Sequence, residues 1–189
     1  MNLKAERGAA TRDQLLAIAT RLFAEHGYEG TSIEAVLQES GLSRGALYHH
    51  YAGKDALFEA VLEAKEAAIG RDILKAVKGL DDPAEILRTG ALAWIRLAGD
   101  PVIQRIVLID APSVLGWQQW RALEERYSFG SLKLALQATD AVPAEFLDLH
   151  AHMLLAAINE SALLVARGGD RDTAEAAVEE FLRRLLRRP

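Results

Sequence analysis

The chain has 189 residues, of which 50% are hydrophobic, and a formal net charge of −5 from 22 basic and 27 acidic side chains. This composition is sufficient for a sizeable core and excludes intrinsic disorder over most of the chain. The lack of cysteine excludes disulfides, thiol nucleophiles and zinc–thiolate sites. Because no uninterrupted run of about 18 apolar residues occurs and charged residues stand near the start, we expect a cytoplasmic protein with no membrane partner.

Apolar residues recur at helical spacing almost everywhere, whereas alternation with a period of two is never sustained. This pattern predicts an all-α fold of about nine helices. Thr11 and Gln14 have the spacing of a capping box for a first helix, which Gly27 would end. Two short helices are expected next, over 33–40 and 43–48, so that three helices lie within about fifty residues.

Longer helices are expected after this N-terminal group. Asp82, Asp100 and Asp172 are placed to cap the starts of three of them, and Ala111-Pro112 is placed to end one. The expected helices lie over 54–78, from 82, over 101–111, 115–138 and 143–167, and from 172.

The expected boundary between two structural units falls within the helix over 54–78, without a flexible linker. We predict an N-terminal unit of residues 1–54 and a larger helical unit of residues 55–189. Six basic and six acidic side chains cancel in the first unit, so the net charge of −5 belongs to the second. The acidic total is therefore no evidence against nucleic-acid binding by the first unit.

The turn Ser40-Gly41-Leu42-Ser43 joins the second and third expected helices. Gly41 permits a positive φ, Leu42 supplies an apolar anchor, and Ser43 caps the next helix. This is helix-turn-helix geometry, in which the second helix enters a DNA major groove about 12 Å wide. The residues expected to be exposed on that helix are Ser43, Arg44, Gly45, Tyr48 and His49.

An ordered set of motifs covers about residues 10 to 58: Thr11-Arg12, Leu22-Phe23-Ala24, Gly27-Tyr28, Thr31-Ser32, Ser40-Gly41-Leu42-Ser43, Gly45, Leu47-Tyr48, His50-Tyr51 and Lys54. In this set the chain resembles the tetracycline-repressor (TetR) family of transcriptional regulators. One departure is Leu37, where family members usually carry a small alanine.

The resemblance implies contacts with DNA phosphates and with base edges. Helix N-termini favour anions, and a guanidinium such as that of Arg44 can bond a guanine edge through two hydrogen bonds. Thr31 and Ser32 have a helix-capping role as an alternative or in addition, and Leu47 and Tyr51 are assigned to the core. The implied phosphate contacts are Thr31, Ser32, Tyr48, His50 and Lys54. The implied base contacts are Arg44, Gly45 and His49, and Ser43 is a further exposed candidate for contact with DNA.

The helices over 143–167 and from 172 carry apolar stripes, and in the TetR family the last two long helices pair with those of a second copy. Packing within one chain is the alternative. The expected homodimer interface is Phe146, Leu164, Val178, Phe181, Leu182 and Leu185.

Aromatic side chains near a few polar groups in the second unit suit a pocket for an apolar or aromatic small molecule. A purely structural role in the core is the alternative for these aromatics. The expected effector-binding residues are Trp94, Gln104, Trp117, Trp120, Tyr127, His150 and Met153.

No catalytic constellation, phosphate-binding loop or metal motif is present in the sequence. Neighbouring helical residues such as His49 and His50 point about 100° apart, which disfavours a shared metal. We therefore expect no enzyme, no catalytic residues, no metal and no cofactor. The resemblance implies a homodimeric, ligand-responsive repressor that binds a palindromic double-stranded operator and is released by a small-molecule effector. The alternative is a helical small-molecule-binding protein whose DNA-binding unit is vestigial.

Overall fold

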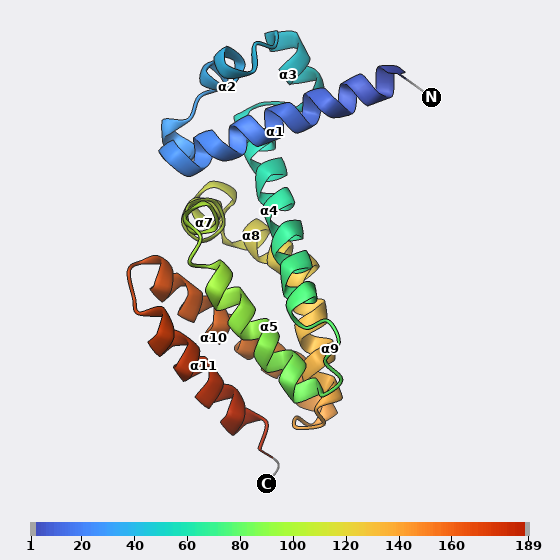
Figure 1. Cartoon of the computed structure of the whole chain (residues 1–189), viewed down its shortest axis with the longest axis vertical. Helices are drawn as coiled ribbons and strands as arrows, with labels where there is room; N and C mark the ends of the chain where they lie inside the picture. The colour runs from blue at the N-terminus through green and yellow to red at the C-terminus, as the bar shows by residue number, and fades with distance from the viewer. Residues whose placement is uncertain (1–2, 188–189) are drawn as a thin grey trace.

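The computed structural model describes residues 3–187, and this part of the chain is helical without a strand, which confirms the predicted all-α class. Figure 1 shows an elongated molecule with one small helical unit at the top. The helices of this unit are α1 (Leu3–Gly30), α2 (Ile33–Ser40) and α3 (Arg44–His50).

Helix α4 (Lys54–Ala76) runs from the small unit down into the larger one, so it belongs to both (Figure 1). The remaining helices form the lower part of the molecule, where α10 and α11 run side by side. They are α5 (Pro83–Leu97), α6 (Pro101–Ile103), the π-helical η1 (Gln104–Asp110), α7 (Ala111–Leu115), α8 (Trp117–Glu124), the π-helical η2 (Glu125–Phe129), α9 (Gly130–Ala138), the 3-10 turn η3 (Ala144–Phe146), α10 (Leu147–Ala166) and α11 (Arg171–Leu185).

The first helix begins earlier than the capping box predicts. Thr11 lies inside α1, because all of residues 3–10 except Gly8 are good helix formers and extend the helix. The Gln14 side chain donates instead to the Ser40 carbonyl oxygen at 3.0 Å, which ties α1 to the end of α2. Gly27 does end the regular helix, with φ of 73°.

Two of the longer predicted helices are interrupted by π-helical turns. The predicted end at Ala111-Pro112 is wrong, because Pro112 lies in the first turn of α7, where a missing N–H is tolerated. That helix ends before Gly116, which has φ of 77°. The cap of α11 is Asp170 rather than Asp172, since the Asp170 carboxylate accepts from the backbone N–H of Thr173 at 2.8 Å.

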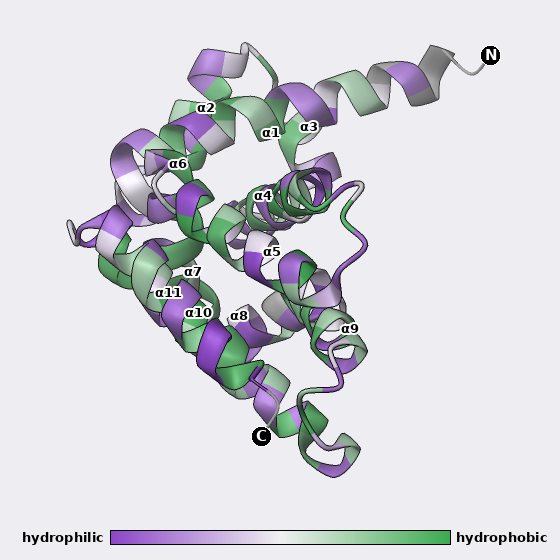
Figure 2. Cartoon of the chain, turned by 60° about the horizontal axis from the view of Figure 1, so that its bottom comes forward, coloured by the Kyte–Doolittle hydropathy of each residue, from purple (hydrophilic) through white to green (hydrophobic). Residues whose placement is uncertain are grey.

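One continuous apolar core runs from the small unit into the large one. In the small unit Phe23, Leu47 and Phe58 are fully buried, and the rings of Phe23 and Phe58 meet edge to face at 5.1 Å. Figure 2 shows hydrophilic and hydrophobic residues alternating along most helices, which is the amphipathic pattern expected of helices that share a core. The small unit is therefore packed against the rest of the molecule.

Candidate functional site

The turn between α2 and α3 has the geometry that the sequence predicts. Gly41 adopts a left-handed conformation with φ of 67°, and its N–H donates to the Leu37 carbonyl oxygen at 3.0 Å. The Ser43 hydroxyl oxygen then accepts from the backbone N–H of Ala46 at 3.2 Å and caps α3. Both contacts are local, so the sequence itself sets the angle between the two helices.

Helix α3 is anchored by its inner face. Leu47 is fully buried, and the buried Tyr51 donates its hydroxyl hydrogen to the Arg12 carbonyl oxygen at 3.5 Å. The opposite face is open to solvent. The exposed residues on this face and at its cap are Ser43, Arg44, Gly45, Tyr48 and His49.

The two residues before α2 have different roles. Ser32 is exposed, and its hydroxyl oxygen accepts from the Ala35 N–H at 3.1 Å as a helix cap. Thr31 is buried, and its hydroxyl lies within hydrogen-bond distance of the carbonyl oxygens of Gly27 at 2.8 Å and Leu22 at 3.1 Å. The predicted phosphate contact of the Thr31 side chain is therefore corrected, because this hydroxyl is used inside the protein.

Acidic residues accompany the basic and phenolic groups near this surface. Arg44 forms an ion pair with Glu34. A hydrogen bond from the Glu34 backbone, followed by one from the Arg44 side chain, lowers the pKa of the Glu34 carboxyl. Lys54 Nζ lies 4.0 Å from the centre of the Tyr28 ring, and the Tyr28 hydroxyl donates to Asp55. Burial, followed by that hydrogen bond, raises the pKa of Tyr28 to about 12.

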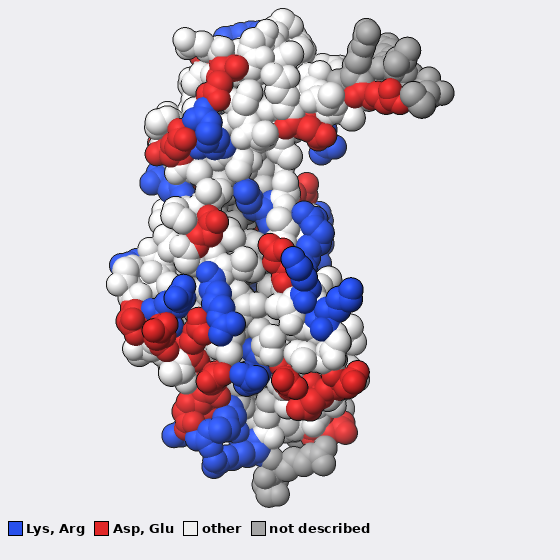
Figure 3. Space-filling view, viewed as in Figure 1, with Lys and Arg blue, Asp and Glu red and all other residues white. Residues whose placement is uncertain are grey.

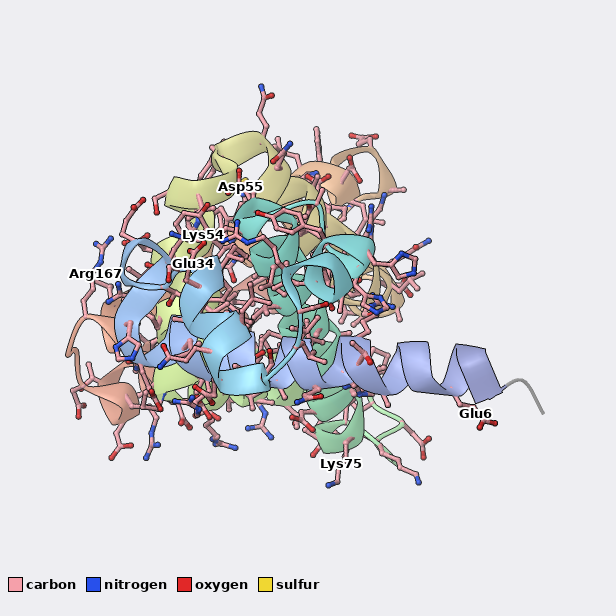
Figure 4. All side chains as sticks on the ribbon, turned by 90° about the horizontal axis from the view of Figure 1, so that it is seen from above. Glu6, Glu34, Lys54, Asp55, Lys75 and Arg167 are labelled. Atoms are coloured by element: carbon pink, nitrogen blue, oxygen red, sulfur yellow. The ribbon has the colours of Figure 1, made fainter. Side chains whose placement is uncertain are left out.

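These pairs leave the small unit without a strongly basic surface. Figure 4, seen from above the small unit, shows Lys54 and Asp55 together at the start of α4, with Glu34 nearby in the same view. Figure 3 shows a largely uncharged face at the top and denser charge over the lower helices. DNA contact by this unit would thus depend on helix N-termini and a few cations rather than on bulk charge.

A buried carboxylate joins the small unit to the lower helices. Asp110, at the end of η1, accepts from the backbone N–H of Tyr28 at 2.7 Å and from Arg105 Nε at 3.1 Å. The Arg105 guanidinium packs on Gly27 so closely that a Cβ atom there would lie 1.7 Å from its Nη2 atom. The positive φ therefore favours glycine at position 27, and a Cβ there would also displace the Arg105 guanidinium.

A cavity of about 440 Å³ lies among α4, α5, α9 and α10. Its wall consists mainly of leucine, isoleucine, valine and alanine side chains, with polar groups from Glu66, Ser128, Ser131 and Asn159. Trp94 supplies an aromatic ring, and its indole N–H donates to Asn159 Oδ1 at 2.9 Å. The volume and the apolar lining are typical of a small-molecule site.

Of the residues predicted to contact an effector, only Trp94 belongs to this cavity wall. Trp117 and Met153 are more than half exposed on the outside, Trp120 is buried in the core, and the His150 ring lies 3.0 Å from the Phe146 carbonyl oxygen. Aromatic content alone therefore misplaced the site, because these side chains face other parts of the fold. The predicted residues outside the wall are Gln104, Trp117, Trp120, Tyr127, His150 and Met153.

The predicted dimer residues also separate into two groups. Val178 and Leu182 are buried against the chain's own core, so they are not available to a partner. Phe146, Leu164 and Phe181 are large apolar side chains that remain about half exposed. Leu185 is partly buried at the edge of the core.

Two residues with potential functional roles were missed from the sequence. Glu66 follows Leu62 by four residues and precedes Ile69 by three, so it stands on the apolar stripe of α4, a signal that was available. Asp110 gives no local signal of its role, because its partner Tyr28 lies 82 residues away in the sequence.

Comparison with known sequences matches the N-terminal and C-terminal parts of the chain to profiles of one family. The family profile described as "Bacterial regulatory proteins, tetR family" matches residues 15–61, and that described as "Tetracyclin repressor-like, C-terminal domain" matches residues 84–189. The chain belongs to the TetR family. It is therefore a DNA-binding transcriptional regulator of the kind that the resemblance in its first fifty residues implied.

Named TetR-family relatives agree with this assignment. The HTH-type transcriptional repressor Rv1474c of Mycobacterium tuberculosis is 30% identical over 95% of both chains. The repressor AcnR of Corynebacterium glutamicum is 34% identical over 56% of this chain and 60% of its own. A crystal structure of a TetR-family regulator from Pectobacterium atrosepticum is 32% identical, with a TM-score of 0.80 over 97% of this chain and 98% of that one. These relatives are regulators rather than enzymes.

Proposed function

We propose that this TetR-family protein is a homodimeric cytoplasmic repressor that holds a palindromic operator and releases it when a small molecule fills the cavity. Residues 1–54 would form the DNA-binding unit, and residues 55–189 the effector-binding and dimerisation unit. The observation that carries the proposal is the exposed face of α3, set by the capped turn at Gly41 and Ser43. Two such helices about one DNA turn apart fit successive major grooves.

Base recognition is assigned to the exposed side of α3. Arg44 would exchange its Glu34 partner for a guanine edge, and because that ion pair is exposed the exchange has a small cost. Ser32 lies at the N-terminus of α2, where backbone N–H groups favour a phosphate. The proposed phosphate contacts are Ser32, Tyr48, His50 and Lys54, and the residues proposed at the bases are Ser43, Arg44, Gly45 and His49.

The dimer is assigned to the outer face of α10. Among the described residues, the helical segment Ala144–Ala166 is long and apolar enough to cross a membrane by length and composition alone. Its most apolar 18-residue window has a mean hydropathy of 1.4, and 39% of that window is buried inside the protein. A second copy of the chain would cover the rest, as in a helical dimer interface. The exposed apolar residues proposed for this interface are Leu149, Met153 and Leu164 of α10, Phe146 at the end of η3, and Phe181 of α11.

Two features support coupling between the cavity and the DNA-binding unit. Lys54 begins α4 and Glu66 reaches the cavity from the same helix, so the two residues are about 18 Å apart along one rigid element. The Asp110 contacts to Tyr28 and Arg105 join the small unit to η1. A ligand that favours a shifted α4 would favour a spacing of the two α3 helices that no longer fits DNA.

Selection of fragments from genomic DNA by the purified protein tests this proposal. We expect enriched fragments to share an inverted repeat, and Arg44→Ala to lower the affinity for that repeat about tenfold or more. Arg88→Ala is the matched control, because Arg88 is also exposed and paired, with Glu179 at 2.8 Å, but lies on α5. Enriched fragments without a shared sequence, or equal losses of DNA affinity in Arg44→Ala and Arg88→Ala, would contradict the assignment of α3 as the helix that recognises bases.

A further inference from the structure

The cavity contains one acidic group in an otherwise apolar wall. Glu66 is only 4% exposed, and it is the one titratable side chain among the described residues that line the cavity. Burial raises the pKa of its carboxyl to about 7, and no neighbouring charge contributes to that rise. No described residue forms an ion pair or a side-chain hydrogen bond with Glu66, so its carboxyl is available to bind a ligand in the cavity.

No other described residue of the cavity wall carries a charge. The Trp94 indole N–H in the wall donates to Asn159 Oδ1. Ser128 and Ser131 have neutral hydroxyls, so they carry no charge to neutralise Glu66. An ionised Glu66 therefore favours a cation from outside and disfavours an anion in the same space.

The shape of the site limits the rest of the ligand. Leu74 lies eight residues beyond Glu66 on α4, which is about 12 Å along the helix, and its side chain is exposed. Leu134 of α9 is also exposed and lines the cavity. On α4 the wall residues between Glu66 and Leu74 are Ile69, Gly70 and Ile73, and most of the remaining wall is apolar, so the cavity suits a hydrocarbon or aromatic body.

We propose that the cavity binds a cationic amphiphile, in which one protonated amine pairs with Glu66 and an apolar body extends along α4 towards Leu74 and Leu134. This inference rests on the proposed role of the cavity as the effector site and adds the chemical class of the effector. An ammonium–carboxylate pair within an apolar wall gives a strong, charge-assisted hydrogen bond.

Three probes with the same chain and different head groups test the charge requirement. Octylamine, 1-octanol and octanoate are titrated into the full chain by isothermal calorimetry at pH 7. We expect octylamine to bind at least tenfold more tightly than octanol, and octanoate to bind more weakly than either. Glu66→Gln should lower octylamine affinity at least tenfold and leave octanol affinity within about twofold.

Glu59→Gln is the matched control, because it makes the same change on an exposed position of α4. It should leave all three affinities unchanged. If octanol binds as tightly as octylamine, or if octylamine binds wild type and Glu66→Gln with equal affinity, the cation proposal is overturned. The cavity would still be a ligand site in that case. Binding of none of the probes would overturn both, whereas DNA binding is measured separately by the genomic selection.

Proton release provides a second readout that a structural role for Glu66 would not change. A carboxyl with a pKa of about 7 is roughly half protonated at pH 7, so pairing with octylamine should release about half a proton. Titrations in buffers of different ionisation enthalpy measure this number. Release that persists in Glu66→Gln, or is as large with octanol, would contradict the pairing of the amine with Glu66.

Discussion

Replacing Glu66 by glutamine should stabilise the protein at neutral and alkaline pH. The carboxyl is buried in an apolar wall, and this burial raises its pKa from 4.5 to about 7. In the folded protein the group therefore holds its proton up to about pH 7, whereas in the unfolded chain it ionises from about pH 4.5 upward. The unfolded state thus binds fewer protons over this interval, and wild-type stability falls as the pH rises through it.

The size of the effect follows from the pKa difference. Each unit corresponds to about 1.36 kcal/mol, so the full penalty above pH 7 is about 3 kcal/mol. Between pH 5 and pH 8 wild type should lose about 2 to 3 kcal/mol relative to Glu66→Gln, which has the same shape but no charge. For a chain of this length that difference corresponds to about 5 to 10 °C in Tm.

Thermal unfolding followed by circular dichroism at pH 5 and pH 8 measures this difference. Wild type, Glu66→Gln and Glu59→Gln should be compared at one protein concentration, because the proposed dimerisation would make Tm depend on concentration. The Glu59→Gln curve should stay parallel to wild type. A constant offset between wild type and Glu66→Gln at both pH values would refute the reasoning, since it would show that Glu66 does not titrate in this interval.

Three further predictions concern the Asp110 contacts between the small unit and η1, the neighbouring Gly27, and the proposed dimer. Asp110→Ala leaves the Tyr28 N–H and Arg105 without their acceptor, so it should lower the free energy of unfolding by about 1 to 3 kcal/mol in urea titrations. An unchanged urea midpoint would contradict a stabilising role for these Asp110 contacts. Gly27→Ala should cost more than about 1 kcal/mol in the same assay, because the new Cβ both strains a positive φ and displaces Arg105. Leu164→Glu should convert the proposed dimer to a monomer in sedimentation experiments and weaken DNA binding; a dimer that persists in this variant would exclude this face of α10 as the interface.

The features that could be predicted from the sequence are those set by local chemistry. The capping serines Ser32 and Ser43 and the positive φ of Gly41 depend on residues within four positions, and all three are found as expected. Asp82 and Asp100, each followed by proline, cap α5 and α6 for the same reason. The helix-turn-helix geometry was predictable because it is a local property.

Features that depend on distant contacts were harder to predict. The apolar stripe of α11 indicates a buried face but not what covers it, and Val178 and Leu182 pack within the chain while Phe181 stays exposed. Thr31 has a cap-like position, but its hydroxyl turns inward to carbonyl groups of α1. Aromatic side chains such as Trp117 carry no information about which side of a helix faces a cavity.

The effect of a cavity ligand on DNA affinity tests the central claim most directly. Fluorescence anisotropy of a labelled inverted repeat from the genomic selection is measured with rising octylamine, with Glu66→Gln as the control. The account predicts that octylamine lowers the DNA affinity of wild type, that DNA lowers octylamine affinity by the same factor, and that Glu66→Gln requires at least tenfold more octylamine. Octylamine that binds the cavity but leaves DNA affinity unchanged would contradict it.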